Sequence, residues 1–151
     1  MNTLKQGDKV PDFTVNNQDG NPVSLTDFKG KKLVIFFYPK ASTPGCTAEA
    51  CNLTDNYKLL QEKGFEVLGV SADSEKRQTN FKAKYSFPFD LLADENKKVI
   101  EAFGVWGEKK FMGKTYDGIH RKTFLVDESG VVAHVIDKVK TKDHAAQILE
   151  L

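Results

Sequence analysis

The sequence predicts an α/β fold in which a central mixed β-sheet is flanked by helices. Two continuous apolar runs, Lys32–Tyr38 and Phe65–Ser71, are rich in β-forming residues and lack the alternation of a half-exposed strand. Runs of this kind are typical of strands that are buried on both faces. A segment with helical features follows each run, and this order of elements covers both faces of a sheet.

Two β-hairpins are also predicted, one near each end of the chain. Each consists of two short segments of β-forming residues separated by residues that favour turns. The N-terminal hairpin pairs Phe13–Val15 with Val23–Leu25 around Asp19-Gly20, and the C-terminal one pairs Arg121–Val126 with Val131–Ile136 around Glu128–Gly130.

Four helices and one further strand complete the prediction. In the first helix Leu53, Tyr57 and Leu60 are spaced by four and three residues, and Gly64 ends the pattern. Either Asp73 or Ser74 can cap the second helix. The helices are expected at 44–63, 74–85, 94–103 and 142–151, and the short strand at Phe89–Leu92. Strands and helices in this order follow the plan of a thioredoxin-like fold.

The segment Gly104–His120 does not fit this alternation. It contains four glycines, and it interleaves Trp106, Phe111, Met112 and Tyr116 with lysines. Connections of this length without secondary structure are usually functional or disordered. Its aromatic residues argue against disorder, so a function is expected.

The bulk composition indicates one ordinary globular domain spanning residues 1–151. The chain has 40% apolar and 28% charged residues, and no repeat or linker divides it. Its formal net charge of +1 argues against a nucleic-acid partner. No apolar run is long enough to cross a membrane, and the start of the sequence does not resemble a signal peptide, so a cytoplasmic location is expected.

Only two cysteines occur, Cys46 and Cys51. A structural disulfide is not expected in a reducing compartment, so the pair is interpreted as catalytic or redox-sensing. Cys46 lies between a buried strand and a predicted helix, with Thr43 at the N-cap and Pro44 at the first helical position. At a helix N-terminus the free backbone N–H groups and the helix dipole stabilise a thiolate, which is the nucleophilic form. The alternative is an inert buried thiol.

The spacing of the cysteines restricts how they can react. Five residues apart in an intact helix, their Cα atoms lie roughly 8–9 Å from each other on faces about 140° apart. A disulfide needs Cα atoms within about 7 Å. We therefore expect the start of the helix to unwind before Cys51 reaches Cys46. Gly45 and Thr47, both weak helix formers, favour such unwinding.

The segment Tyr38–Cys51, which reads YPKASTPGCTAEAC, resembles the active-site segment of peroxiredoxins. More narrowly it is similar to the peroxiredoxin Q group, also called bacterioferritin comigratory protein, whose second cysteine lies five residues after the first. The resemblance extends over nearly the whole chain. Its further segments are Asp19-Gly20, Leu25–Phe28, Gly104–Lys109 and Gly113–Arg121.

This resemblance implies a role for each residue of the motif. Pro39 would shield the site, Thr43 would give a hydroxyl to the peroxide, and Cys46 would attack. Arg121 would stabilise the thiolate and the polarised O–O bond. Arg121 is also a candidate on chemical grounds, because a guanidinium holds donors in a fixed fork and stays charged.

The implied reaction reduces a hydroperoxide through a sulfenic acid on Cys46, which condenses with Cys51 to a disulfide. An external dithiol, thioredoxin or glutaredoxin, would then reduce the disulfide. The chemistry requires no cofactor or metal. Because the resolving thiol is on the same chain, no second copy is needed and a monomer is expected.

Other functions remain as alternatives. A non-enzymatic peroxide sensor would use the same disulfide to switch a partner surface, through the Trp106–Tyr116 loop. A holdase chaperone would suppress aggregation without either cysteine. The sequence lacks Cys-x-x-Cys, and its three histidines lack the spacing of zinc ligands.

Overall fold

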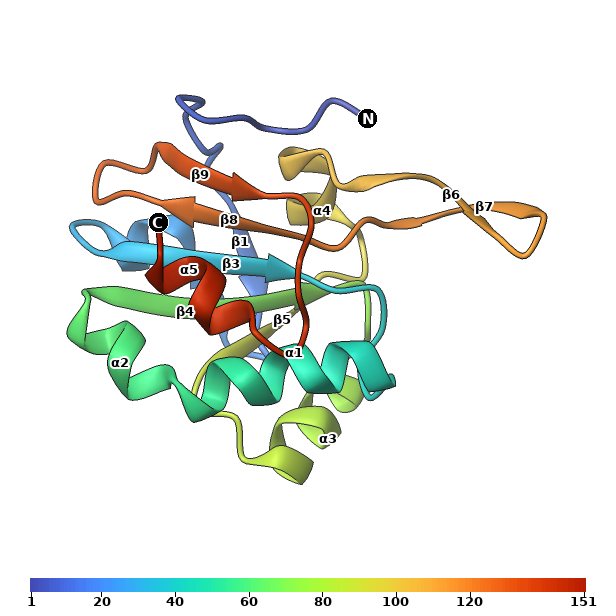
Figure 1. Ribbon diagram of the computed structural model, residues 1–151, viewed down its shortest axis with the longest axis horizontal. Helices are drawn as coiled ribbons and strands as arrows, with labels where there is room; N and C mark the ends of the chain where they lie inside the picture. The colour runs from blue at the N-terminus through green and yellow to red at the C-terminus, as the bar shows by residue number, and fades with distance from the viewer.

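A mixed five-stranded β-sheet forms the centre of the molecule (Figure 1). The computed structural model describes all of residues 1–151. The strands lie in the order β5-β4-β3-β8-β9, in which β3, β4 and β5 are parallel and β8 and β9 run antiparallel to their neighbours. Their bounds are β3 Lys32–Phe37, β4 Phe65–Ser71, β5 Asp90–Ala93, β8 Lys122–Val126 and β9 Val132–Ile136. The expected central mixed sheet is confirmed.

Helices cover both faces of this sheet. One face is packed against α1, α2, α3 and α5, and the other against α4 and the N-terminal segment. The N-terminal segment includes the expected hairpin, followed by a short 3₁₀ turn, η1. The bounds are α1 Pro44–Asp55, α2 Tyr57–Glu62, α3 Glu75–Tyr85, α4 Lys98–Phe103, α5 His144–Leu149, β1 Thr14–Asn16, β2 Pro22–Ser24 and η1 Leu25–Phe28.

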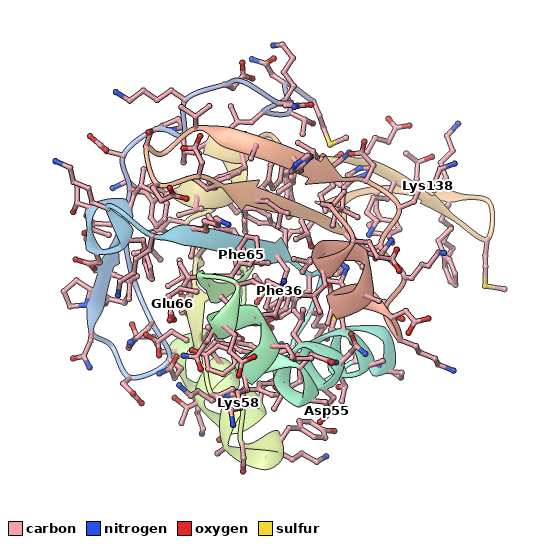
Figure 2. All side chains as sticks on the ribbon, turned by 60° about the vertical axis from the view of Figure 1, so that its left-hand side comes forward. Phe36, Asp55, Lys58, Phe65, Glu66 and Lys138 are labelled. Atoms are coloured by element: carbon pink, nitrogen blue, oxygen red, sulfur yellow. The ribbon has the colours of Figure 1, made fainter.

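The central strand β3 explains why the core has two halves. Successive side chains of a strand point to opposite faces, so Val34 and Phe36 join the cluster beneath α1 while Leu33 and Ile35 join the other. Figure 2 shows Phe36 enclosed between sheet and helices, where it is fully buried. Because both faces are covered, the strand is apolar throughout.

The helix expected over residues 44–63 is interrupted. Asn56 leaves the helical conformation, with φ −112° and ψ 12°, and its side chain donates a hydrogen bond to the backbone oxygen of Asn52. This local side-chain bond competes with continuation of the helix. The result is two helices, α1 and α2, and both cysteines lie in α1.

Other boundaries also differ from the expectation, and the last helix, expected at 142–151, is observed as α5 at His144–Leu149. The helix expected from Asp94 begins at Lys98, because the Asp94 carboxylate accepts the N–H groups of Lys98, Val99 and Ile100 and so caps the helix from several residues upstream. The short strand is shifted by one residue to Asp90–Ala93. The cap of α3 is confirmed at Ser74, whose hydroxyl accepts the Arg77 N–H.

The segment Gly104–His120, to which no secondary structure was assigned, is largely a β-hairpin. It pairs β6 (Trp106–Phe111) with β7 (Lys114–Ile119) and projects from the body of the molecule (Figure 1). Both residues of the turn have positive φ, 51° at Met112 and 77° at Gly113, as a tight two-residue hairpin turn requires. Met-Gly is a weaker turn signal than Asn-Gly, which explains why the hairpin was missed.

No helix of the structure is both long enough and apolar enough to cross a membrane.

We predict that Phe36→Ala lowers the free energy of unfolding by about 3–5 kcal/mol, because it opens a cavity in a closed core. Phe111→Ala is the matched control, since the Phe111 side chain is 66% exposed on the hairpin and its loss should change stability by less than about 0.5 kcal/mol. Urea denaturation measures both. Equal losses in the two variants would contradict this description of the core.

Candidate active site

The pairing of β3 with β8 brings two distant parts of the sequence together. These strands are antiparallel, and Phe37 at the end of β3 lies opposite Lys122 at the start of β8. The loop after β3 leads into α1, and Arg121 directly precedes β8. The start of α1 and the Arg121 side chain are therefore placed at the same end of the sheet.

Cys46 lies in the first turn of α1, as expected from the sequence. Thr43 occupies the N-cap and Pro44 the first helical position. The Cys46 side chain is buried, with 1% exposed, and Arg121 Nη2 donates a hydrogen bond to its Sγ atom at 3.2 Å. A donor of fixed positive charge at this distance stabilises a thiolate over a neutral thiol.

Thr43 and Pro39 occupy the loop between β3 and α1. Thr43 holds the expected N-cap position, but its hydroxyl does not cap the helix and instead donates to the backbone oxygen of Lys40 at 2.8 Å. The lone pairs of this hydroxyl can still accept a hydrogen bond. Pro39 directly follows the buried Tyr38 and is itself exposed, so its shielding role stays a prediction.

A buried polar network fixes this loop from below. The Asp73 carboxylate accepts the backbone N–H of Ala41 at 2.7 Å and the hydroxyl of Ser71 at 2.6 Å. Ser71 in turn accepts from Gln78, which accepts the Tyr38 hydroxyl. Burial raises the pKa of Tyr38, so its hydroxyl stays protonated and serves as a donor. This series of hydrogen bonds thus anchors the loop to the strands beneath it.

Gly45 allows the guanidinium to approach the helix. A Cβ atom at this position would lie 3.3 Å from Arg121 Nη2, closer than an ordinary van der Waals contact. A side chain here would push the guanidinium away from Cys46. Gly45 therefore has two effects. Its weak helix propensity was expected from the sequence, and the space that it leaves for the guanidinium was not.

Glu49 is the second partner of Arg121. Its Oε1 atom accepts from Arg121 Nη1 at 2.6 Å, and its side chain is fully buried. Burial raises the pKa of Glu49 to about 7, although the charge and hydrogen bond of Arg121 act in the opposite direction. Sequence reasoning missed this residue. Its signal was a carboxylate three residues after Cys46, which is one helical turn along the same face.

His144 lies behind Glu49 and was also missed. Its Nε2 atom lies 3.5 Å from Glu49 Oε2 and 2.7 Å from Thr123 Oγ1, and the ring is fully buried. Glu49 Oε2 has no hydrogen-bond partner. Burial lowers the pKa of His144 below its ordinary value of 6.5. No local motif marks this histidine, because its contacts are made across the fold.

Cys51 lies further along α1, half-buried, and both cysteines are free thiols. The helix runs unbroken through both positions, so its geometry separates their Cα atoms by roughly 8–9 Å. That is beyond the reach of a disulfide. Burial, with the charge of Asp55, raises the pKa of the Cys51 thiol. Cys51 is therefore not activated while α1 is folded.

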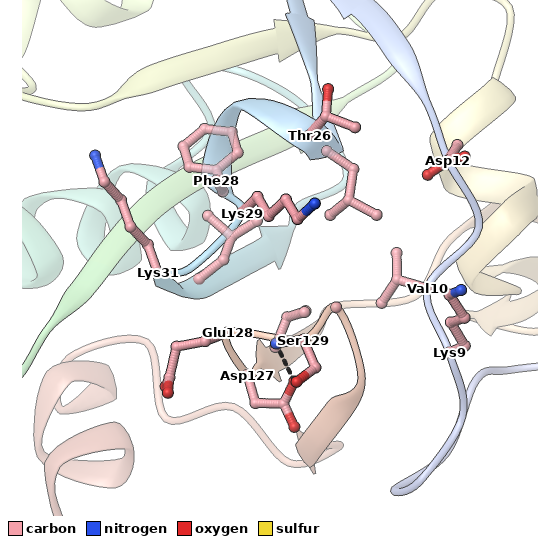
Figure 3. A pocket seen from close by; sticks show the side chains of 14 residues that line it. Lys9, Val10, Asp12, Thr26, Phe28, Lys29, Lys31, Asp127, Glu128 and Ser129 are labelled. Carbon is pink, nitrogen blue, oxygen red and sulfur yellow. Dashed lines mark hydrogen bonds between the residues drawn. The ribbon is translucent and has the colours of Figure 1, made fainter.

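A pocket lies away from these residues (Figure 3). It is found between η1, the N-terminal segment and the β8–β9 turn, and it contains neither cysteine nor histidine. Its lining carries charges of both signs, among them Lys29, Lys31, Asp127 and Glu128. Asp127 is engaged in the turn, where it accepts the Ser129 N–H. No group of histidines, cysteines and carboxylates in the structure is arranged to hold a metal ion.

The fold and the site together define a class of protein. It is a thioredoxin-like domain with a buried cysteine in the first turn of a helix, hydrogen-bonded by an arginine that directly precedes a strand of the central sheet. A second cysteine follows on the same helix.

Comparison with known proteins agrees with this class. A profile of the AhpC/TSA family matches residues 6–135. Peroxiredoxin Bcp of Escherichia coli is 52% identical over 99% of this chain and 96% of its own, and peroxiredoxin Bcp of Bacillus subtilis is 45% identical over 98% and 94%. The structure of the bacterioferritin comigratory protein of Xanthomonas campestris, a protein with alkyl peroxide reduction activity, superposes with a TM-score of 0.86 at 38% identity, covering 91% of this chain and 88% of that one.

The chain therefore belongs to the AhpC/TSA family, and its homologues there are Bcp peroxiredoxins. These relatives support a role as a thiol peroxidase.

We predict that Glu49 makes stability depend on pH. Its pKa rises from an ordinary 4.5 to about 7 on folding, so the folded state retains a proton that the unfolded state has lost. Its contribution is fully present below about 4.5, falls as pH rises to about 7, and stays constant above that value.

Glu49→Gln removes this titration. The difference in unfolding free energy, wild type minus Glu49→Gln, should therefore fall by a few kcal/mol between about pH 4.5 and about pH 7. The lowered pKa of His144 makes the unfolding free energy rise with pH instead, and it does so in both proteins. A difference that is flat with pH would show that Glu49 is ionised normally.

Proposed function

We propose that the protein is a thiol peroxidase that reduces hydrogen peroxide and organic hydroperoxides with Cys46 as the peroxidatic cysteine. The observation that carries the proposal is the 3.2 Å contact from Arg121 Nη2 to Cys46 Sγ. A thiolate is required because it, and not the thiol, is the nucleophile. Family membership and the alkyl peroxide activity of the Xanthomonas relative support the same substrate class.

In the first step the Cys46 thiolate attacks one oxygen of the hydroperoxide. An S–O bond forms and the O–O bond breaks, and its electron pair leaves with the distal oxygen, which takes a proton and departs as water or an alcohol. Cys46 is oxidised to a sulfenic acid. Arg121 stabilises the developing charge, Thr43 orients the peroxide through its hydroxyl, and Pro39 limits access of water.

In the second step the thiol of Cys51 displaces the sulfenic oxygen as water, forming the Cys46–Cys51 disulfide. The geometry of α1 requires the helix to unwind first. Three attachments resist this unwinding: the Arg121–Glu49 hydrogen bond, the Arg121–Cys46 contact, and a bridge from Asn52 to α5. The folded site is thus suited to the first step and the unwound helix to the second.

In the third step a dithiol protein reduces the disulfide by thiol–disulfide exchange. We infer thioredoxin as this reductant, with glutaredoxin as the alternative. Such reductants operate in the cytosol, so a cytoplasmic location is part of the proposal. Both cysteines are on one helix, so a monomer suffices for the cycle.

The cysteine roles predict distinct products with an equimolar amount of hydrogen peroxide, followed by intact mass against time. The wild type should lose two hydrogens as the disulfide forms, and Cys51→Ser should retain one added oxygen. Cys46→Ser should remain unchanged. A reduced wild-type protein at the end of the reaction would overturn the proposed function.

Repeated turnover separates an enzyme from the peroxide sensor that the same chemistry would allow. With thioredoxin, its reductase and NADPH, an enzyme consumes many equivalents of peroxide per chain. A sensor stops after a single oxidation. Consumption of one equivalent alone would assign the sensor function.

The bridge from Asn52 to α5 yields a further prediction. Asn52 Nδ2 donates to the Lys142 oxygen at 2.9 Å, and Oδ1 accepts the Ala145 N–H at 2.8 Å. Asn52→Ala removes both bonds and makes unwinding of α1 easier by about 1 kcal/mol. The conversion of sulfenic acid to disulfide should become about fivefold faster.

Rapid mixing with peroxide, quenching and mass analysis measure this conversion. Asn80→Ala, at an exposed position of α3, is the matched control and should leave the rate unchanged. A slower conversion in Asn52→Ala would mean that unwinding of α1 does not limit the reaction.

A further inference from the structure

A buried cluster connects α5 to Cys46 through two intermediate side chains. Arg121 contacts both Cys46 Sγ and Glu49 Oε1, and the other oxygen of Glu49 faces His144 at 3.5 Å. Glu49 and His144 have no exposed side-chain surface. An unpartnered carboxylate oxygen in a buried site is costly, so the role of Glu49 Oε2 calls for an explanation.

The surroundings of His144 determine which ring nitrogen carries the proton. Gln147 Oε1 accepts the Lys140 N–H at 2.9 Å, and Gln147 Nε2 donates to the Lys138 oxygen at 2.9 Å, so the amide orientation is fixed. His144 Nδ1 lies 2.8 Å from the same Oε1 atom and must act as the donor. In a neutral ring, Nε2 is then an acceptor.

This tautomer sets the protonation of Glu49. The one lone pair of His144 Nε2 accepts the Thr123 hydroxyl at 2.7 Å, so the neutral ring has no proton to donate to Glu49 Oε2, which lies 3.5 Å away. An ionised Glu49 would therefore leave a charged oxygen buried without a donor, which costs more than a neutral, protonated carboxyl in the same place. The raised pKa of Glu49 and the lowered pKa of His144 agree with a neutral pair in which Glu49 holds the proton.

We propose that His144 is a positioning residue for the peroxidase reaction: because its ring offers Glu49 Oε2 no donor, Glu49 stays protonated and leaves the charge of Arg121 to the Cys46 thiolate. This inference rests on the proposed function. An ionised Glu49 would share the guanidinium charge at 2.6 Å and so weaken its attraction for the thiolate. His144 acts through Glu49 and Arg121 and touches neither cysteine nor substrate.

The charged groups around this pair come from three elements. Arg121, ahead of β8, faces Glu49 Oε1, and Cys46 lies on the same helix as Glu49. Lys109 on β6 donates to the Ile119 oxygen, and burial, with the charge of Arg121, lowers its pKa. Glu49 is thus the one acid shown in contact with the guanidinium, so its protonation should determine how the Arg121 charge is shared.

The first test measures the proton without peroxide. Infrared spectra of the Cys51→Ser protein should show the carbonyl band of a buried protonated carboxyl, absent in Glu49→Gln, that disappears with a midpoint near pH 7. His144→Gln replaces a ring that offers Glu49 no donor with an amide that can donate to the carboxylate. It should lower the midpoint by about one pH unit, a tenfold change in proton affinity.

The second test measures the consequence for Cys46. The rate of its oxidation by hydrogen peroxide, normalised to the thiolate fraction from ultraviolet absorbance, should fall as Glu49 ionises. His144→Gln should shift this fall to lower pH together with the infrared midpoint. Glu49→Gln should abolish it, and adding His144→Gln to that variant should change the rate by less than about twofold.

Two comparisons separate positioning from a structural role. His134→Gln on β9 is the matched histidine control and should move neither midpoint. A purely structural role for His144 would lower the melting temperature and reduce the rate equally with and without Glu49, and this result would overturn the proposal. So would an unchanged infrared midpoint in His144→Gln. If peroxide fails to oxidise the parent protein, the proposed function fails while the infrared result still decides the protonation of Glu49.

Discussion

The fork of Arg121 is the interaction on which the site depends. One nitrogen of the guanidinium reaches Cys46 Sγ at 3.2 Å and another reaches Glu49 Oε1 at 2.6 Å. A planar group with fixed donors can serve both partners at once, which a single ammonium cannot do in the same geometry. The two partners lie one helical turn apart on α1, so the guanidinium also fixes the rotation of the helix about its axis. Gly45 leaves the space through which the fork approaches.

In the proposed cycle, the same contacts create a conflict between the two chemical steps. They favour a folded α1 while Cys46 is a thiolate, yet a folded α1 keeps Cys51 out of reach. Oxidation in that cycle would convert the Cys46 thiolate to a neutral sulfenic acid and so remove the negative charge beside Arg121. In the proposed cycle the attraction between α1 and Arg121 thus weakens at the step after which the helix must open. The bridge from Asn52 to α5 remains as resistance that does not depend on the state of Cys46.

Local sequence patterns predicted the central secondary-structure elements of this molecule well. The apolar runs of β3 and β4, the cap of α3, and the position of Cys46 at the start of a helix each depend on neighbouring residues, and each is confirmed. The contact of Arg121 with Cys46 was expected from a family resemblance, and the pairing of β3 with β8 supplies its physical basis.

What the sequence did not reveal depends on distant partners or on weak local signals. The turn of the β6–β7 hairpin is Met-Gly, which has little intrinsic preference for that geometry. Asp94 caps α4 from four residues away, so the start of the helix was placed too early. Judged from residue type alone, Glu49 and His144 would be expected at the surface. Only the packing of α5 against α1 buries them together.

The role of the Arg121 fork is tested most directly by the rate constant for oxidation of Cys46 by hydrogen peroxide in Arg121→Lys, measured in the Cys51→Ser background. Lysine retains the positive charge, so Glu49 keeps a partner and the fold should remain intact, as the melting temperature would verify. One ammonium cannot reproduce both contacts of the fork, so we predict a loss of at least about tenfold in the rate. A rate equal to that of the parent would show that the reactivity of Cys46 does not depend on the guanidinium, and would contradict the role proposed for Arg121.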